Sequence, residues 1–268
     1  MKENHKKDIP PAGIIAPLKN KRKYTHDRYI PSPSLAAFIE HYWFVQWHLP
    51  AGERFVQQTL PHPCVHLVFE ANESRLVGLM TRHFARTLQG SGKVVGIKFK
   101  PGAFYCFHQQ KLSALTDALH NGDGIFGKQT NTMARFISAQ NDHKVIIKQI
   151  EGFLLSLNPA FYENFRIVET TVKLIQTDKL VKSVDQLCHQ LGVGKRKLQR
   201  IFQRHVGVGP KWLIQRYRMF DILDFLHAEN KDWNMLLSYT GYNDQSHFIK
   251  DFKRCTGLTP GQYLIANR

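Results

Sequence analysis

Two stretches of the chain, residues 195–204 and 245–254, place hydrogen-bond donors around a regular apolar stripe. Apolar residues recur there at spacings of three and four, which predicts one buried helical face in each: Leu198, Ile201 and Phe202, then Phe248, Ile249 and Phe252. Basic, amide and hydroxyl side chains cover the remaining faces. Such groups can donate hydrogen bonds to phosphate oxygens and to the edges of nucleic-acid bases.

Each stretch is bounded by the same turn signals. A glycine precedes it, Gly192 or Gly241, and a Gly-x-x-Pro sequence follows it, at residues 207–210 and 257–260. Asp244 can cap the second helix, because the first N–H groups of a helix need an acceptor. The repeat predicts two helix-turn-helix units, each with a recognition helix.

Residues 166–268 resemble the tandem helix-turn-helix domain of the AraC/XylS family of bacterial transcription regulators. Residues 241–260 are similar to the family's signature over its whole length. The resemblance implies seven helices, with a long helix over about residues 210–228 bridging the two units. It also implies sequence-specific binding of double-stranded DNA that raises or lowers transcription.

The chain departs from the family's pattern at three positions. Gly194 replaces the usual serine cap, which costs only a few tenths of a kcal/mol. Ile222 and Leu237 replace alanines, and larger side chains at close helix contacts require compensating space. We therefore expect altered packing in the second unit and an unchanged fold.

The resemblance also assigns roles to individual side chains. Positions that contact bases in the family correspond here to Arg196, Gln199 and Arg200, then to Gln245, Ser246 and Lys250, with His247 close by. Arginine suits the O6 and N7 atoms of guanine, and glutamine suits adenine. The neighbouring cations are expected to bind phosphates, which orients a protein without reading sequence: Lys195, Lys197, Arg204, Lys253 and Arg254.

The first half of the chain has a different pattern. Short β-rich runs at residues 55–60, 65–70, 75–80 and 94–99 are separated by turn residues, which predicts an antiparallel sandwich or small barrel. Helical spacing predicts helices within residues 31–47, 103–119 and 128–160, and at 164–177. The fold class is therefore α+β, with an N-terminal β-rich part and an all-α C-terminal part.

This half resembles the N-terminal domain of some AraC-type regulators, on segments 29–33, 41–43, 60–69, 96–103 and 124–127. The resemblance implies effector sensing or dimerisation, so a small molecule and RNA polymerase join DNA as candidate partners. The apolar stripe of residues 145–157 fits either packing on its own barrel or a dimer seam. Monomer and homodimer both stay open.

Other chemistry in the sequence is weaker. His62, Cys64 and His66 alternate along a predicted strand and could ligate zinc or copper, but a proline interrupts them and no fourth ligand is evident. No P-loop, dinucleotide fingerprint or nucleophile elbow is present, so we expect no enzyme and no cofactor. Two alternatives remain: a DNA-repair regulator with a reactive cysteine, and an architectural DNA-binding protein.

Composition agrees with a polyanionic partner. The formal net charge is +16 and the isoelectric point about 9.8. Four scattered cysteines predict free thiols in a reducing cytoplasm, and no apolar run is long enough to cross a membrane. We expect a flexible basic arm over residues 1–28, an N-terminal domain over 29–160 and the DNA-binding domain over 161–268.

Overall fold

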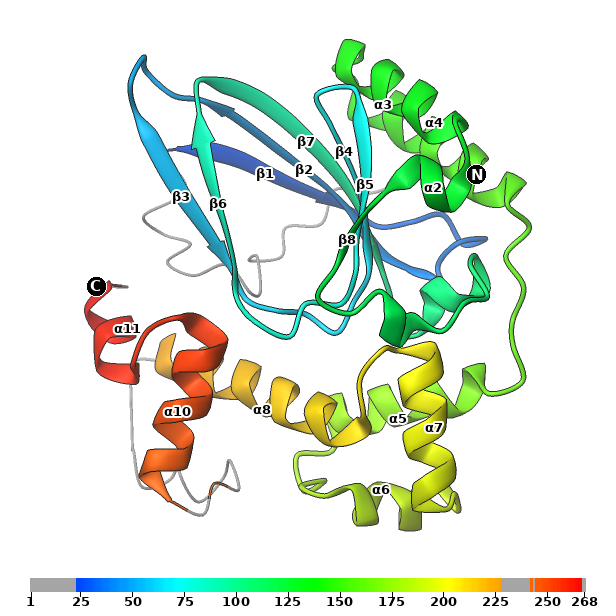
Figure 1. Ribbon diagram of the computed structural model, residues 1–268, viewed down its shortest axis with the longest axis vertical. Helices are drawn as coiled ribbons and strands as arrows, with labels where there is room; N and C mark the ends of the chain where they lie inside the picture. The colour runs from blue at the N-terminus through cyan, green and yellow to red at the C-terminus, as the bar shows by residue number, and fades with distance from the viewer. Residues whose placement is uncertain (1–22, 228–241, 243, 267–268) are drawn as a thin grey trace.

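The computed structural model describes residues 23–227, 242 and 244–266. The strands gather in one half of the molecule and the C-terminal helices in the other, with α8 (Pro210–His227) running along the boundary between them (Figure 1). This arrangement confirms the α+β prediction. Residues 1–22, which are most of the predicted basic arm, lie outside the described residues. So does the segment predicted to hold the first helix of the second helix-turn-helix unit, with Leu237 and Gly241.

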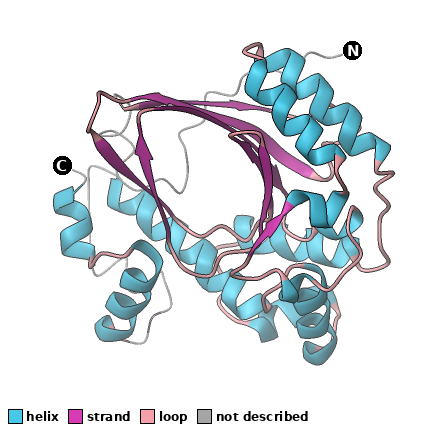
Figure 2. Cartoon of the chain, turned by 45° about the horizontal axis from the view of Figure 1, so that its top comes forward, coloured by secondary structure: helices cyan, strands magenta, loops and turns pink. Residues whose placement is uncertain are grey.

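The main sheet has six antiparallel strands in the order β1-β2-β7-β4-β5-β8. Its strands are β1 (Tyr24–Tyr29), β2 (Ile39–His48), β4 (His66–Glu70), β5 (Glu73–Val77), β7 (Ser91–Phe99) and β8 (Leu119–Asn121). A second, two-stranded sheet pairs β3 (Arg54–Thr59) with β6 (Phe84–Gln89). The six-stranded sheet curves, and the β3–β6 pair stands opposite its concave face (Figure 2).

The four predicted strands correspond to β3, β4, β5 and β7, but the helix predicted at residues 31–47 is wrong. Residues 33–38 form turns, and β2 follows from Ile39. Leu35, Phe38, Ile39 and Tyr42 are buried, as their spacing suggested. The spacing of these apolar residues resembled that of a helix because β2 is covered on both faces. Its apolar residues therefore do not alternate with polar ones.

Two further predictions in this half need correction. Residues 24–28, assigned to a flexible arm, form most of β1, which pairs with β2 along its whole length. The segment 103–119 contains only two short 3₁₀ turns, η1 (Ala103–Cys106) and η2 (Leu112–Ala114), instead of a helix. Both segments are held by contacts with distant parts of the chain, which local spacing does not report.

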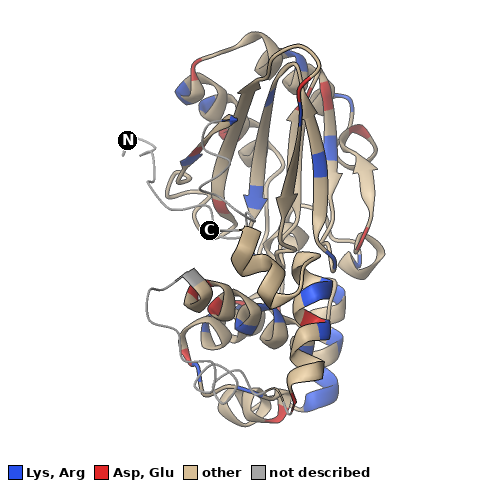
Figure 3. Ribbon diagram, turned by 90° about the vertical axis from the view of Figure 1, so that its left-hand side faces the viewer, with Lys and Arg blue, Asp and Glu red and all other residues tan. Residues whose placement is uncertain are grey.

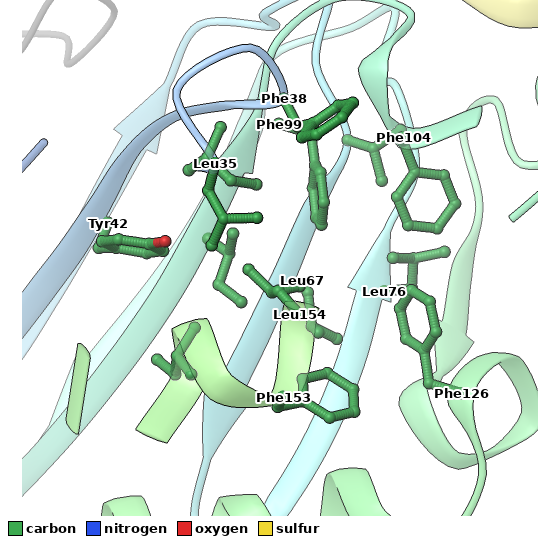
Figure 4. Packing of buried hydrophobic residues seen from close by; sticks show 14 of the residues in the cluster. Leu35, Phe38, Tyr42, Leu67, Leu76, Phe99, Phe104, Phe126, Phe153 and Leu154 are labelled. Carbon is green, nitrogen blue, oxygen red and sulfur yellow. The ribbon is translucent and has the colours of Figure 1, made fainter. Parts of the chain in front are cut away.

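Three helices pack against the six-stranded sheet: α2 (Gly122–Phe126), α3 (Gln129–Ala139) and α4 (His143–Ser156). One apolar core joins the convex face of the sheet to α3 and α4, with Leu67, Leu76 and Phe99 meeting Phe153 and Leu154 (Figure 4). Most of the apolar stripe of α4 is buried in this core, which supports packing on its own domain. Val145 and Leu155 are exposed.

The C-terminal helices form two smaller cores. α5 (Phe165–Thr177), α6 (Val184–Leu191) and α7 (Lys195–His205) pack with the start of α8, while α10 (Gln245–Thr256) and α11 (Pro260–Ala266) pack with its end. Leu79 joins the first of these cores and Leu60 the second, so loops of the strand-rich half contribute to both. None of the described helices is both long and apolar enough to cross a membrane.

Candidate nucleic-acid interface

The first helix-turn-helix unit is built from α6, a glycine turn and α7. Ser183 and Gln186 form a reciprocal capping box at the start of α6. Gly192 ends α6 with φ of 63°, a left-handed conformation that glycine adopts without steric cost. Gly194 occupies the N-cap of α7 without a side-chain hydrogen bond, in agreement with its replacement of a serine cap.

Helix α7 has two distinct faces. Leu198, Ile201 and Phe202 are buried and fix the helix against α5 and α8. The polar residues expected to contact DNA are all exposed: Lys195, Arg196, Lys197, Gln199, Arg200 and Arg204. The helix therefore presents a row of cations and two amides, Gln199 and Gln203, to solvent while its apolar stripe is buried.

Helix α10 repeats this arrangement at the other end of α8 (Figure 1). The Asp244 carboxylate accepts a hydrogen bond from the His247 backbone at 2.7 Å, so it caps the helix as predicted. Phe248 and Phe252 are buried. The expected contact residues are exposed: Gln245, Ser246, His247, Lys250, Lys253 and Arg254. Lys and Arg gather on helices along one edge of the helical half in Figure 3.

Several of these side chains already have partners within the chain. Lys195 pairs with Asp185 on α6 at 2.9 Å, and Arg254 pairs with Asp251 at 2.8 Å. Both pairs are solvent-exposed on the cation side, where such pairs contribute little stability and exchange readily. They leave the cations available to other anions.

Arg204 is held by the strand-rich half. Its Nε donates to the Tyr105 hydroxyl at 3.0 Å, and its guanidinium lies 5.8 Å from the centre of that ring. Lys197, Arg200 and Arg204 line one wall of an open groove, whose other wall includes Tyr105 and Glu163. Part of the polar face of α7 is thus turned toward Tyr105 of η1 and toward the segment that leads into α5.

The end of α7 also packs against the strand-rich half. The buried His205 ring stacks on Tyr162 at 4.2 Å and meets Tyr105 edge-on at 4.5 Å. Burial lowers its pKa below the usual value of 6.5. Nearby, the Thr116 hydroxyl donates to the Gly207 carbonyl at 3.0 Å.

Sequence reasoning missed two buried arginines of α8 that fix the positions of both units. Arg218 donates to the Val181 carbonyl and pairs with Asp221, which holds the first unit. Arg216 bonds the Cys255 sulfur of α10 and donates to the Thr81 carbonyl at 3.2 Å, which holds the second unit and a loop of the strand-rich half. The sequence did contain a signal, because both arginines lie among apolar residues. An arginine that is buried in such a segment is expected to have a partner.

The strand-rich half encloses a cavity of 270 Å³. Alternate residues of each strand face opposite sides of a sheet, so one set packs on α3 and α4 while the other lines the cavity. The lining is mainly apolar and aromatic, with a few histidines and cations. It also includes Leu60 and His62 of one loop and Met80 of another.

The candidate metal ligands have other partners. His66 Nδ1 accepts from the Trp43 indole at 3.2 Å, Cys64 bonds Glu40, and His62 lies 3.4 Å from the Lys98 ammonium. Among the described residues, no group of three or more His, Cys, Asp or Glu side chains could hold a metal ion. Carboxylates of the same half also bind neighbours: Glu70 pairs with Arg86, and Asp117 accepts a hydrogen bond from the Thr81 hydroxyl.

The cysteines are free thiols, and three of them, Cys64, Cys106 and Cys255, are buried. Burial raises the pKa of Cys64 well above its usual range and that of Cys106 to about 12. A nucleophilic cysteine needs the opposite shift, because the thiolate is the reactive form. The geometry therefore gives no support to the alternative of a DNA-repair regulator with a reactive cysteine.

Separate family models match the two halves of the chain. Residues 27–121 match a family model described as a domain of unknown function, DUF6597, and residues 187–265 match one described as a helix-turn-helix domain. The chain is 30% identical over 81 residues to the raffinose operon transcriptional regulatory protein RafR of Pediococcus pentosaceus, covering 30% of this chain and 29% of that one. It is 24% identical over 113 residues to an uncharacterized HTH-type transcriptional regulator of Haemophilus influenzae, covering 42% and 36%.

The matches thus span about a third of the length of these curated relatives. Among solved structures, an apo variant of ToxT from Vibrio cholerae aligns with 85% of this chain and 98% of its own, at 13% identity and a TM-score of 0.44. A second ToxT structure aligns with 84% and 98%, at 11% identity and a TM-score of 0.43. The helix-turn-helix match over residues 187–265 and the similarity to two bacterial transcription regulators agree with the resemblance of the two C-terminal motifs to the AraC/XylS family.

Proposed function

We propose that this chain is a sequence-specific DNA-binding transcription regulator, divided into an N-terminal domain near residues 29–160 and a DNA-binding domain from about residue 161. The observation that carries the proposal is the pair α7 and α10. Each helix has a buried apolar stripe and an exposed polar face, and the two lie at opposite ends of one long helix. Recognition helices so placed would enter successive major grooves, about 34 Å apart.

The exposed residues divide by chemistry into two roles. Arg196, Gln199 and Arg200 on α7 would read bases, because arginine and glutamine can each make two hydrogen bonds to a purine. On α10 the corresponding residues are Gln245, Ser246, His247 and Lys250. The flanking cations would bind phosphates, which adds affinity that depends on salt concentration and not on sequence: Lys195, Lys197, Arg204, Lys253 and Arg254.

We further propose that a small molecule in the N-terminal cavity controls DNA binding. The loops that line the cavity also hold the DNA-binding half. The His62 ring lies 4.6 Å from Phe220 of α8, and Leu60 packs into the core formed by α8, α10 and α11. Thr81, next to the lining residue Met80, accepts a hydrogen bond from Arg216. A ligand that displaces these loops would therefore alter the packing of α8.

Selection of bound sites from random double-stranded DNA tests the proposal. We expect a two-part consensus whose halves are separated by about one helical turn, 10–10.5 base pairs. Strong binding without any consensus would identify an architectural DNA-binding protein instead. A consensus with only one half would mean that α10 does not read bases.

A further inference from the structure

The floor of the N-terminal cavity contains two flat tryptophans. Trp43 and Trp47 lie on the same face of β2, and each lies against a glycine of β7, its cross-strand neighbour. A Cβ atom added to Gly96 would lie 2.0 Å from the Trp43 ring, and one added to Gly92 would lie 2.1 Å from Trp47. The two glycines therefore allow the indoles to lie close against the sheet.

Hydrogen bonds fix both indoles. The Trp43 Nε1–H donates to His66 at 3.2 Å, and the Trp47 Nε1–H donates to the Gln89 carbonyl at 3.1 Å. With their polar atoms satisfied at the edges, the rings present aromatic surface, and the Arg86 guanidinium lies over Trp47 at 6.0 Å from the ring centre. Such a floor favours a flat, aromatic ligand, because ring pairs gain more than the burial of area alone.

Arg28 differs from the other cations that line the cavity in its lack of a close carboxylate partner. Lys98, Arg75 and Arg86 are paired with the carboxylates of Glu40, Glu73 and Glu70 respectively. Arg28 makes no ion pair within 4 Å among the described residues, and its buried Nε has no hydrogen-bond partner there. The Glu40 carboxylate, which is paired with Lys98, attracts it only from farther away. In the sheet register Arg28 lies directly opposite Trp43, so the unpaired guanidinium and the aromatic floor adjoin.

The nearby histidines do not add further positive charge. Burial lowers the pKa of His26 to about 4, that of His66 to about 3 and that of His41 to about 2, so all three are neutral at pH 7. A buried, unpaired guanidinium is expected to bind an anion, and its planar fork matches a carboxylate. The cavity thus combines one anion site with one aromatic surface.

We propose that the cavity binds an aromatic monocarboxylate, with its ring against Trp43 and Trp47 and its carboxylate on Arg28. This proposal names the class of small molecule in the control mechanism proposed above. It depends on that mechanism only for the claim that the ligand changes DNA binding. Binding itself is measurable without DNA, so the ligand class and the regulatory role can fail separately.

Calorimetric titration of the full chain with three matched probes tests the ligand class. The probes are 3-phenylpropanoate, its neutral amide, and 3-cyclohexylpropanoate, which keeps the charge and removes the aromatic ring. We expect the phenyl acid to bind at least about tenfold more tightly than the amide, because charge-assisted hydrogen bonds are lost. It should also bind more tightly than the cyclohexyl acid.

Three variants locate the site. Arg28→Met should remove the preference for the acid over the amide. Gly96→Ala should weaken both, because its methyl group displaces the Trp43 ring. Gly152→Ala, on the exposed side of α4 with nothing within 4 Å of the added methyl, should bind as the unaltered chain does. Circular dichroism and urea unfolding of each variant establish that it is folded.

Each contrary result overturns a stated part of the proposal. Equal binding of acid and amide excludes Arg28 as the anion site, and equal binding of the phenyl and cyclohexyl acids excludes the aromatic floor. No heat of binding from any probe at millimolar concentration overturns the ligand class altogether. Unchanged binding by a folded Gly96→Ala variant places the ligand elsewhere.

Discussion

At the scale of single residues, Arg200 offers a direct test of the proposed base-reading role. Arg200 is exposed on α7, on a different face from the buried Phe202, and it lines the groove beside the strand-rich half. We expect Arg200→Ala to cost about 1–3 kcal/mol of binding free energy on a selected site and to relax the base preference there. Gel-shift titration measures this, with Arg135→Ala on α3 as a control; an equal loss on random DNA would contradict the role.

Lys195 should behave differently because it is expected to contact phosphate. Its exposed pair with Asp185 is easily exchanged for a phosphate oxygen. We expect Lys195→Ala to weaken binding to every sequence alike and to reduce the slope of log K against log salt by about one. Lys148→Ala on α4 serves as the control, and a loss confined to the selected site would argue for base reading.

The buried histidines make stability depend on pH. His66 and His41 stay neutral in the folded chain, where their pKa values are lowered to about 3 and about 2, but protonate near 6.5 when unfolded. Between these folded values and pH 6.5, the unfolded state therefore binds more protons than the folded state does. Stability is therefore complete above pH 6.5 and falls as the pH drops below it, by up to about 1.4 kcal/mol per pH unit for each histidine.

Urea unfolding at pH 7, 6 and 5 measures this decline. His66→Gln removes one titrating group while keeping an acceptor for the Trp43 indole, so its decline should be shallower. Parallel declines for the variant and the unaltered chain would show that His66 does not contribute.

At the scale of elements, α10 depends on its cap. Asp244→Ala leaves the His247 N–H without its acceptor and should lower the free energy of unfolding by about 1 kcal/mol. Asp244→Ser keeps a capping oxygen and should lose much less. Urea unfolding followed by circular dichroism compares the two, and equal losses would mean that the Asp244 charge matters more than the cap.

At the scale of the whole molecule, the contact of α7 with η1 opposes DNA binding if Arg204 must reach a phosphate. Tyr105→Phe removes the acceptor of the Arg204 N–H while keeping the ring against His205. We expect this variant to bind DNA more tightly, by up to about tenfold, since about 1.4 kcal/mol of hydrogen bonding no longer competes.

A matched control is Tyr162→Phe, whose lost hydroxyl donates to the Gly102 carbonyl and not to α7. DNA affinity should be unchanged in that variant. Unchanged affinity in both would show that the Arg204–Tyr105 bond does not compete with DNA.

The local elements of the C-terminal half could be predicted from the sequence because their signals are local. Glycines 192 and 257, the Asp244 cap and the apolar stripes of α7 and α10 each act within a few residues, and the structure has them as expected. The exposure of Arg196, Gln199 and Arg200 follows from the same periodicity, since the apolar stripe determines which face turns outward.

The sequence by itself therefore determined two features: the buried and polar faces of the helices α7 and α10, and the alternation of strands with turns in the first half. Only the tertiary structure decided that β2 is a strand, because both its faces are covered by residues far away in the chain. The same holds for Arg28, whose Nε has no hydrogen-bond partner among the described residues, and for Arg204, which donates to the Tyr105 hydroxyl. Periodicity reports which residues lie on one face, whereas the partner across that face depends on contacts between distant segments.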